Sequence, residues 1–206
     1  MTTETLTRLS IFPLAGALLF PGMHLPLHIF EPRYRALVSD AMARDRLIAM
    51  IQPRGAGETP PLYAVGCVGY MAQIEALTDG RYNIVLEGRS LFRMKRELDV
   101  TTPFRQIEAE LLPVRGNQTL SLAERAGLES ESRKFAVAQG YAVDWESVSR
   151  LDDEALVNGI AQIAPFDAAA KQALLEAENL SDRAELIVQL LQFFGRYDGE
   201  DRVTLQ

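Results

Sequence analysis

Two histidines spaced four residues apart are the first residues in this sequence whose types and spacing could do chemistry. His24 and His28 are the only histidines, and two histidines at this spacing can share a zinc ion when both lie on one face of a helix. Pro26 lies between them, and the apolar residues around them favour an extended segment. On a strand the two rings would share a face but lie about 13 Å apart. We therefore expect two polar positions beside a core strand, and no metal site.

Covalent catalysis needs an activated nucleophile, and the sequence offers one poor candidate. Cys67 is the only cysteine, it lies in the apolar run Val65–Gly69, and no histidine is close to it in sequence. We predict a buried structural thiol. Because a single cysteine cannot form a disulfide within the chain, the composition also fits a reducing compartment.

Nucleotide hydrolysis is not expected either. A phosphate-binding loop ends in glycine and lysine followed by serine or threonine, and no glycine in this chain is followed by lysine. Carboxylate pairs for hydrolysis would need a pocket, which the sequence does not predict. We expect a protein that is not an enzyme, with no catalytic residue and no cofactor.

The charge balance bears on the class of partner. The net charge is -7, whereas nucleic-acid binding depends on cations that neutralise phosphates. Arg89, Arg93, Lys95 and Arg96 form a basic stripe in sequence, but alternation along a strand would spread it over two faces. The polar, acidic start and the absence of an apolar run of about 18 residues predict no signal peptide and no membrane span. We expect a cytoplasmic protein that does not bind nucleic acid.

The first part of the chain, residues 1–115, has the pattern of a β-rich domain with one helix. Short apolar or alternating segments predict strands. Gly66 and Gly69 suggest a bulge or a bend in one of them, and Pro32 suits the first turn of a helix whose apolar residues recur with helical spacing. The predicted strands are Leu9–Leu14, Leu25–Phe30, Leu47–Ile51, Tyr63–Glu75, Arg81–Glu87 and Phe104–Leu111.

The second part, residues 116–206, has the pattern of an α-helical bundle. After a linker at Val114–Gln118, helical spacing begins near Leu120. Asp152 or Asp153 and then Asp167 are predicted N-caps, and Asp182 with Glu185 resembles a capping box. Gly195 is a predicted helix end. The residues predicted to face inward include Leu156, Ile160, Ile163, Ala170, Leu174 and Ala177.

Three places are candidates for binding a partner. The turn Phe20-Pro21-Gly22-Met23 either tucks its side chains under the barrel or offers them to a partner. Glu31 either pairs with Arg33 or Arg35, or caps the helix at Pro32. Arg89 follows a hairpin whose charged residues invite cross-strand pairs. The candidate binding residues are Phe20, Pro21, Met23, Glu31, Arg33, Tyr34 and Arg89.

The same segments resemble a known family. Ile11–Leu14, Leu19–Arg35 and the central block Val65–Gly88 are similar to the N-terminal domain of Lon proteases, especially to its small stand-alone bacterial members. After this block, family members often have the sequence Arg-Phe-Arg. This chain has Leu91-Phe92-Arg93 there, so Leu91 stands in place of the first arginine. The resemblance covers residues 8–195 and implies a twisted, barrel-like, PUA-like β domain followed by a helical bundle.

The resemblance also implies a function. In Lon proteases this domain helps to hold unfolded or tagged substrates, while the ATPase and the Ser–Lys protease lie in other domains. The three lysines of this chain, Lys95, Lys134 and Lys171, lie outside any segment that resembles that active site. We therefore expect a non-catalytic module that binds exposed peptide segments, as an adaptor in protein quality control that works with a protease or chaperone. A small hydrolase with a cleft between barrel and bundle, an RNA-binding PUA-like module, and a self-associating protein stay open as alternatives.

Overall fold

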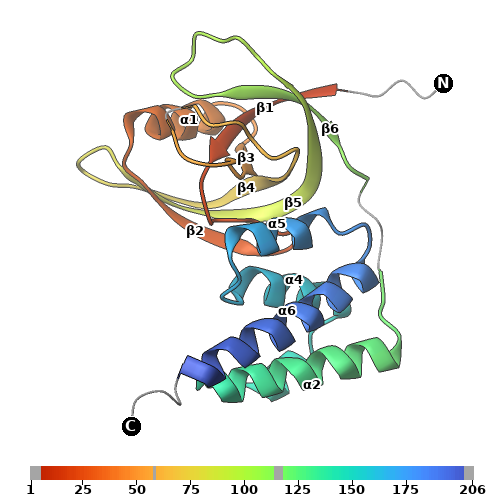
Figure 1. Ribbon diagram of the computed structural model, residues 1–206. Coiled ribbons are helices and arrows are strands. Elements are labelled where there is room, and N and C mark those ends of the chain that lie inside the picture. Colours follow the sequence, from red (N-terminus) through yellow and green to blue (C-terminus); the bar gives the residue numbers. More distant parts are fainter. Residues whose placement is uncertain (1–5, 58, 114–117, 202–206) are drawn as a thin grey trace, which may run out of the picture. The chain divides into compact units, whose positions relative to one another are not determined.

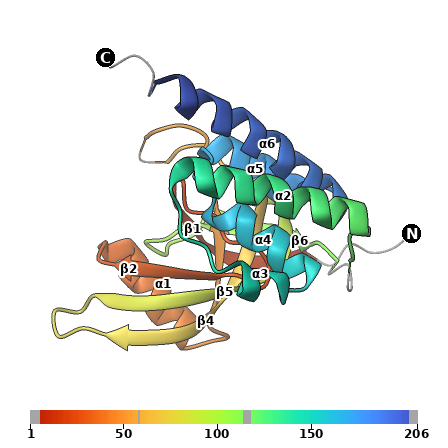
Figure 2. The ribbon, with the colours of Figure 1, turned by 90° about the horizontal axis from the view of Figure 1, so that it is seen from below.

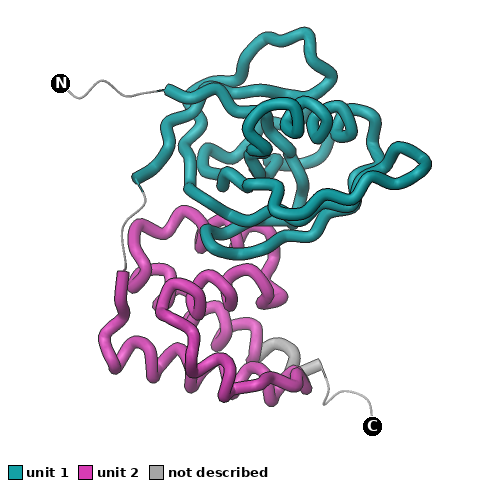
Figure 3. Tube along the Cα trace, turned by 180° about the vertical axis from the view of Figure 1, so that it is seen from behind, with its two compact units in different colours: residues 1–114 teal, residues 115–206 magenta. Residues whose placement is uncertain are grey.

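The chain divides into a β-rich unit of residues 1–114 and a helical unit of residues 115–206 (Figure 3). A computed structural model describes residues 6–57, 59–113 and 118–201, with side chains up to residue 195. The linker predicted at Val114–Gln118 and the tail after residue 201 therefore lie largely outside the described residues. Within the described helices, none is long and apolar enough to cross a membrane.

The first unit is a closed β-barrel with one added strand (Figure 1). Five strands follow one another around the ring in the order β5-β4-β3-β1-β6, and β5 also pairs with β6. Only β1 and β3 are parallel, and the other pairs are antiparallel. The strands are β1 (Leu6–Pro13), β2 (His24–Ile29), β3 (Leu47–Ile51), β4 (Val65–Ala76), β5 (Tyr82–Glu97) and β6 (Gln106–Leu111).

Strand β2 lies outside the ring and extends the sheet. It pairs antiparallel with the first half of β5, so that Pro26 lies opposite Val85 and His28 opposite Asn83. In the described sheet β5 is its one neighbour. Because proline has no N–H for a ladder, an outer strand is where a sheet tolerates it.

Alternation along the strands builds two apolar layers. Helix α1 (Pro32–Met42) places Tyr34, Leu37, Val38 and Ala41 against the inner residues of the sheet. A second cluster fills the barrel around Ile11, Phe92 and Ile107. The predicted faces of one strand are confirmed, since Ile84 and Leu86 are buried and Asn83 is exposed. Leu91, which replaces the family's arginine, packs against the first cluster.

The longest strand was predicted too short. The alternating segment Arg81–Glu87 continues through Gly88 to Glu97 as a single strand, β5. Gly88 does not end the strand. Glycine is required there because the backbone of Phe20 comes so close that a Cβ would lie 2.1 Å from its carbonyl oxygen. The register shifts between Val68 and Gly69, where Arg89 is the extra residue on β5, so the bulge predicted from the glycines of β4 lies beside Gly69.

The second unit consists of helices that begin at side-chain caps. They are α2 (Leu122–Gln139), α3 (Trp145–Ser149), α4 (Asp153–Ile163), α5 (Ala168–Glu176) and α6 (Leu180–Asp201). Helices α2 and α6 run beside each other (Figures 1 and 2). A hydrogen bond links their first ends: the amide of Leu180, the first residue of α6, donates to Oε1 of Gln118, which precedes α2, at 2.7 Å. The predicted caps Asp152 and Asp167 are confirmed by bonds from Ala155 and Ala170.

Three details of the helical prediction were wrong. Helix α6 is capped by Asn179, which accepts from the Asp182 amide at 2.9 Å, so Asp182 lies inside the first turn. Gly195 does not end α6, which continues to Asp201. A Cβ at Gly195 would lie 3.6 Å from the Phe135 ring of α2, an ordinary contact, and the residue does not adopt the left-handed conformation of a helix end. Ile163, predicted to face inward, is 82% exposed because α4 ends there and leaves its last turn uncovered.

Candidate functional site

The predicted binding turn is largely structural. Phe20 is fully buried, so its ring is not on the surface, and the tucked alternative is the one that the structure has. The turn is held by backbone bonds from the Gly22 amide to Gly88 O and from the Gly88 amide to Met23 O, both 2.9 Å. Pro21 and Met23 are partly buried beside it.

The predicted residues at the start of α1 act mainly on one another. Glu31 is the N-cap position but makes no side-chain cap bond. It pairs instead with Arg33, at 2.8 Å. The Arg33 guanidinium lies 4.5 Å from the centre of the Tyr34 ring. Tyr34 is buried, and its hydroxyl donates to Pro13 O at 3.2 Å. Burial raises the pKa of that hydroxyl.

Arg89 is the extra residue of the bulge in β5, which turns its side chain out of the regular alternation. Its guanidinium lies 5.1 Å from the centre of the Tyr70 ring on β4. It pairs with Glu87, two residues earlier on the same strand, at 3.2 Å. Asp79 and Arg81 likewise pair along the chain, so these charge pairs are not the cross-strand pairs that the hairpin suggested.

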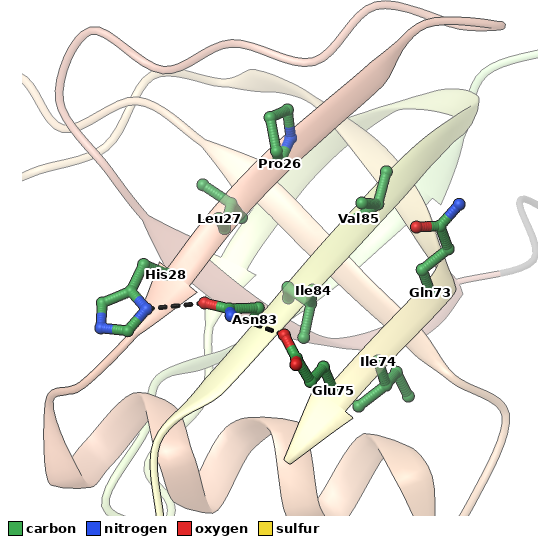
Figure 4. A pocket seen from close by; sticks show the side chains of 9 residues that line it. All are labelled: Pro26, Leu27, His28, Gln73, Ile74, Glu75, Asn83, Ile84 and Val85. Carbon is green, nitrogen blue, oxygen red and sulfur yellow. Dashed lines mark hydrogen bonds between the residues drawn. The ribbon is translucent and has the colours of Figure 1, made fainter. Parts of the chain in front are cut away.

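The open face of strands β2, β5 and β4 carries a shallow groove of about 510 Å³ (Figure 4). We call it the sheet groove. Its lining alternates between apolar and polar positions of the three strands. The lining residues are Pro26, Leu27, His28, Gln73, Ile74, Glu75, Asn83, Ile84 and Val85.

A chain of hydrogen bonds crosses one end of the sheet groove. His28 Nδ1 lies 2.7 Å from Asn83 Oδ1, and Asn83 Nδ2 donates to Glu75 Oε2 at 2.7 Å (Figure 4). An amide oxygen only accepts, so His28 Nδ1 carries the proton. His28 Nε2 is then the acceptor that faces Arg81 Nη1 at 3.3 Å. The imidazole thus has both nitrogens engaged, which suits a fixed polar wall better than a catalytic base.

The sequence prediction missed Phe30, which follows β2. Phe30 is 60% exposed, and its ring stacks on His28 with 6.2 Å between ring centres. The alternation of β2 could have found it, because His24, Pro26, His28 and Phe30 share one parity while Leu25, Leu27 and Ile29 face the core. Phe30 adds an exposed apolar contact at the polar end of the sheet groove.

Catalytic groups do not converge anywhere in the described residues, and no three metal-ligating side chains gather there either. Each clearly shifted pKa has a local cause. Arg81 lowers the pKa of Asp79, and Arg105 lowers that of Glu97. Burial lowers the pKa of Lys171, whose ammonium donates to the Gln162 carbonyl. These groups belong to separate ion pairs, caps and helix ends.

The predicted basic stripe on β5 is largely neutralised. Lys95 pairs with Glu110 at 2.9 Å and Arg96 with Glu108 at 2.8 Å, both on the neighbouring strand β6. Arg89 pairs with Glu87. Cations already paired with carboxylates offer little to a phosphate backbone, so this face does not favour the RNA-binding alternative.

Comparison with known proteins agrees with the architecture. The chain is 28% identical over 194 residues to Lon protease 2 of Myxococcus xanthus, covering 89% of this chain and 23% of that protein. It is 25% identical over 191 residues to Lon protease 2 of Herpetosiphon aurantiacus, with the same shares. The chain thus spans about a quarter of the length of the curated relatives it matches.

Solved structures confirm the fold. The crystal structure of a Lon N-terminal domain protein from Xanthomonas campestris superposes with a TM-score of 0.69 at 21% identity, covering 90% of this chain and 98% of that one. The N-terminal domain of a Mycobacterium avium complex Lon protease gives 0.67 at 17% identity, with the same coverage. The α+β class predicted from the sequence, a β unit followed by helices, is therefore confirmed.

The family model of the ATP-dependent protease La (LON) substrate-binding domain matches residues 8–192. That span runs from β1 into α6 and takes in both units, the sheet groove and the turn at Phe20. The chain belongs to the family of Lon substrate-binding domains.

Proposed function

We propose that this chain recognises exposed segments of other polypeptides and does no chemistry on them. The observation that carries the proposal is the match of residues 8–192 to a substrate-binding domain. The proteins it matches are proteases, and the match lies within about a quarter of their length. We propose that this chain shares with them a recognition step, and that cutting, where it follows, is done by a separate active site.

The sheet groove supports this function physically. Pro26 and Val85 give it an apolar centre, while Gln73 and the bonded row of His28, Asn83 and Glu75 give it polar edges. An extended segment presents apolar side chains and unpaired backbone amides together, and unfolded proteins expose both. A wide, open groove with rigid polar walls suits such a ligand better than a small molecule, which usually binds in a more enclosed pocket.

A cytoplasmic location is part of the same proposal. Cys67 of β4 is buried in the apolar layer that helix α1 covers, and a single cysteine gives no disulfide within the chain. Both are compatible with a reducing compartment.

The proposal is tested by measuring binding of the whole chain to one protein in two states. A small disulfide protein that has been reduced and carboxymethylated stays unfolded, and its native form is the control. Calorimetry is expected to give saturable binding to the unfolded form and none to the native form, with the unfolded protein remaining uncut. Failure to bind, with the circular dichroism spectrum of a folded chain, would contradict the proposal.

A further inference from the structure

The sheet groove presents two neighbouring rows of side chains, one apolar and one polar. Strand pairing sets the residues of each row opposite one another on the open face. The apolar row is Pro26 and Val85, and the polar row is His28, Asn83 and Glu75. Two residues along a strand span about 7 Å. An extended segment that lies along these strands can therefore place one side chain over the apolar row and the side chain two residues away over the polar row.

A bulge in β4 puts Glu75 on this face. The register with β5 shifts between Met71 and Gln73, so that Ala72 is the extra residue. Met71 is fully buried and Ile74 packs against the first apolar cluster, although the two residues are three positions apart. Without the extra residue, Glu75 would share the parity of Met71 and point toward the core. The bulge therefore presents the Glu75 carboxylate to the sheet groove.

A neutral group holds the Glu75 carboxylate in place. Asn83 Nδ2 donates to Glu75 Oε2 at 2.7 Å, and Asn83 Oδ1 is itself bonded by His28 (Figure 4). An ionised carboxylate only accepts hydrogen bonds, and an amide that donates to it orients it without cancelling its charge. The carboxylate is thus fixed in direction and still negative.

The cations around Glu75 are engaged elsewhere. Arg81 bonds Asp79 through two of its nitrogens, at 2.5 and 2.6 Å, and its third nitrogen faces His28. Arg35 of α1 lies at the tip of the hairpin between β4 and β5. In the part of the chain that the structure describes, neither arginine and no other cation forms an ion pair with Glu75. The polar row therefore carries a negative charge that complements a cation of a ligand.

We propose that the sheet groove selects extended segments in which a lysine or arginine lies two residues from an apolar side chain, and that Glu75 bonds the cation. The apolar side chain packs on Pro26 and Val85, and the exposed amide of Gln73 bonds the backbone of the segment. The inference rests on the proposed function, because its ligand is a segment of an unfolded polypeptide. An exposed ion pair contributes little free energy, so Glu75 sets the preference among segments more than the overall affinity.

The probes are blocked, dye-labelled peptides of alternating leucine and threonine whose central residue is lysine, glutamine or glutamate. A leucine lies two residues to each side of the centre, so either direction of binding fits the two rows. Titration with the whole chain is followed by fluorescence anisotropy. We expect the lysine peptide to bind about 2- to 5-fold more tightly than the glutamine peptide, and the glutamate peptide to bind most weakly. The preference is expected to shrink as salt rises from about 0.01 M to about 0.15 M.

Glu75→Gln is the decisive variant. It removes the charge and keeps an oxygen that accepts from Asn83, so folding is preserved, and it is expected to abolish the preference for lysine over glutamine. The matched control is Glu178→Gln, which changes the net charge equally at an exposed residue of the helical unit and is expected to keep the preference. A wild-type chain without the preference, or a Glu75→Gln chain that keeps it, overturns the proposal.

A second set of peptides tests the spacing. Moving both leucines next to the central lysine keeps the composition but takes the apolar side chains off the face that carries the cation, so weaker binding is expected. Equal binding would overturn the two-residue spacing. If unfolded protein binds the whole chain while the lysine preference is absent, the role of Glu75 is wrong and the proposed function stands. If unfolded protein does not bind, the proposed function has failed and this inference fails with it.

Discussion

The two units carry grooves of similar volume, about 510 Å³ in the β unit and about 530 Å³ in the helical unit, whose walls differ in polarity. In the sheet groove the polar side chains bond one another, from Arg81 through His28 and Asn83 to Glu75. The groove of the helical unit, which we call the helical groove, is lined by apolar side chains of α2, α3, α4 and α6, among them Phe135, Trp145 and Leu156. Polar side chains that bond one another form a fixed hydrogen-bonding wall, whereas apolar side chains offer contact area. The two units therefore differ in the contacts that their grooves offer, polar and hydrogen-bonding in the β unit and apolar in the helical unit.

The strongest way to break this comparison is to disturb the backbone that shapes the β unit. In Gly88→Ala the new Cβ would lie 2.1 Å from the Phe20 carbonyl oxygen, so the turn and β5 must separate. We expect a loss of about 3 kcal/mol in the free energy of unfolding, measured by urea denaturation. The matched control is Gly127→Ala in α2, where nothing lies within 4 Å of the new Cβ. That change is expected to stabilise the helical unit by up to about 1 kcal/mol. Equal effects at the two glycines would contradict this account.

A second test removes a polar contact that joins the start of α2 to α4 in the helical unit. Asp153 accepts from the Leu120 amide at 2.8 Å and from Arg125 Nη1 at 2.6 Å. The amide first, and then Arg125, hold the pKa of Asp153 below its ordinary 3.8. The stabilisation that the Asp153 carboxylate gives to the folded state is therefore present above pH 3.8, and it is lost as the pH falls through the lower pKa of the folded state. Asp153→Asn is expected to cost about 1–2 kcal/mol at neutral pH.

The pH dependence provides the control for Asp153. Below the folded-state pKa the wild type and Asp153→Asn should converge in stability, because the wild-type carboxyl is then neutral too. Denaturation series at neutral and strongly acidic pH measure the difference in the free energy of unfolding between the two proteins. A difference that stays constant down to low pH would mean that the charge of Asp153 does not contribute to stability.

A third test concerns a buried hydrogen bond of the β unit, from the Tyr34 hydroxyl to Pro13 O. Tyr34→Phe removes the hydroxyl that donates to Pro13 O but keeps the ring, which lies 4.1 Å from Phe12 between ring centres. We expect a loss of about 1 kcal/mol and unchanged binding of unfolded protein, because the group is buried. Weaker binding at full stability would instead make Tyr34 a contact residue, as the sequence had suggested.

The smallest expected effect on stability is at Phe30. The ring is largely exposed, so Phe30→Ser should change the free energy of unfolding by less than about 0.5 kcal/mol. It is nevertheless expected to weaken the binding of unfolded protein, because Phe30 stacks on His28, which lines the sheet groove. Calorimetry of this variant beside Leu122→Ser, an exposed residue of α2 outside both grooves, measures the difference. Equal binding by the two variants would remove Phe30 from the site.

Periodicity predicted the elements of this fold well and their ends less well. The strand Leu47–Ile51 matches residue for residue, because its apolar run is bounded on both sides by polar or turn-forming residues. The end of β5 was missed, because a glycine required by a distant carbonyl looks in sequence like a strand terminator. The cap of α6 was misplaced by three residues for a similar reason, since Asn179 and Asp182 are both good caps and only the backbone decides between them.

The candidate sites were harder to predict than the fold. Phe20 and Met23 were considered as contacts because they lie on a turn, but a turn that folds back over Gly88 buries the first of them. The helical groove was not foreseen, because its walls come from four helices whose apolar residues all looked like ordinary core positions. Which apolar residues stay uncovered depends on helix lengths and ends, and those are what the sequence pattern specifies least.

Pro26 has a consequence for the outer border of the sheet. The outer border of β2 is the edge at which another extended chain could add a strand to the sheet. Repeated addition of strands at such an edge leads to aggregation. A proline in the middle of that border withholds a donor at the point where such growth would begin. On the proposed function, extended segments bind the face of the sheet while the outer border of β2 resists the addition of a further strand.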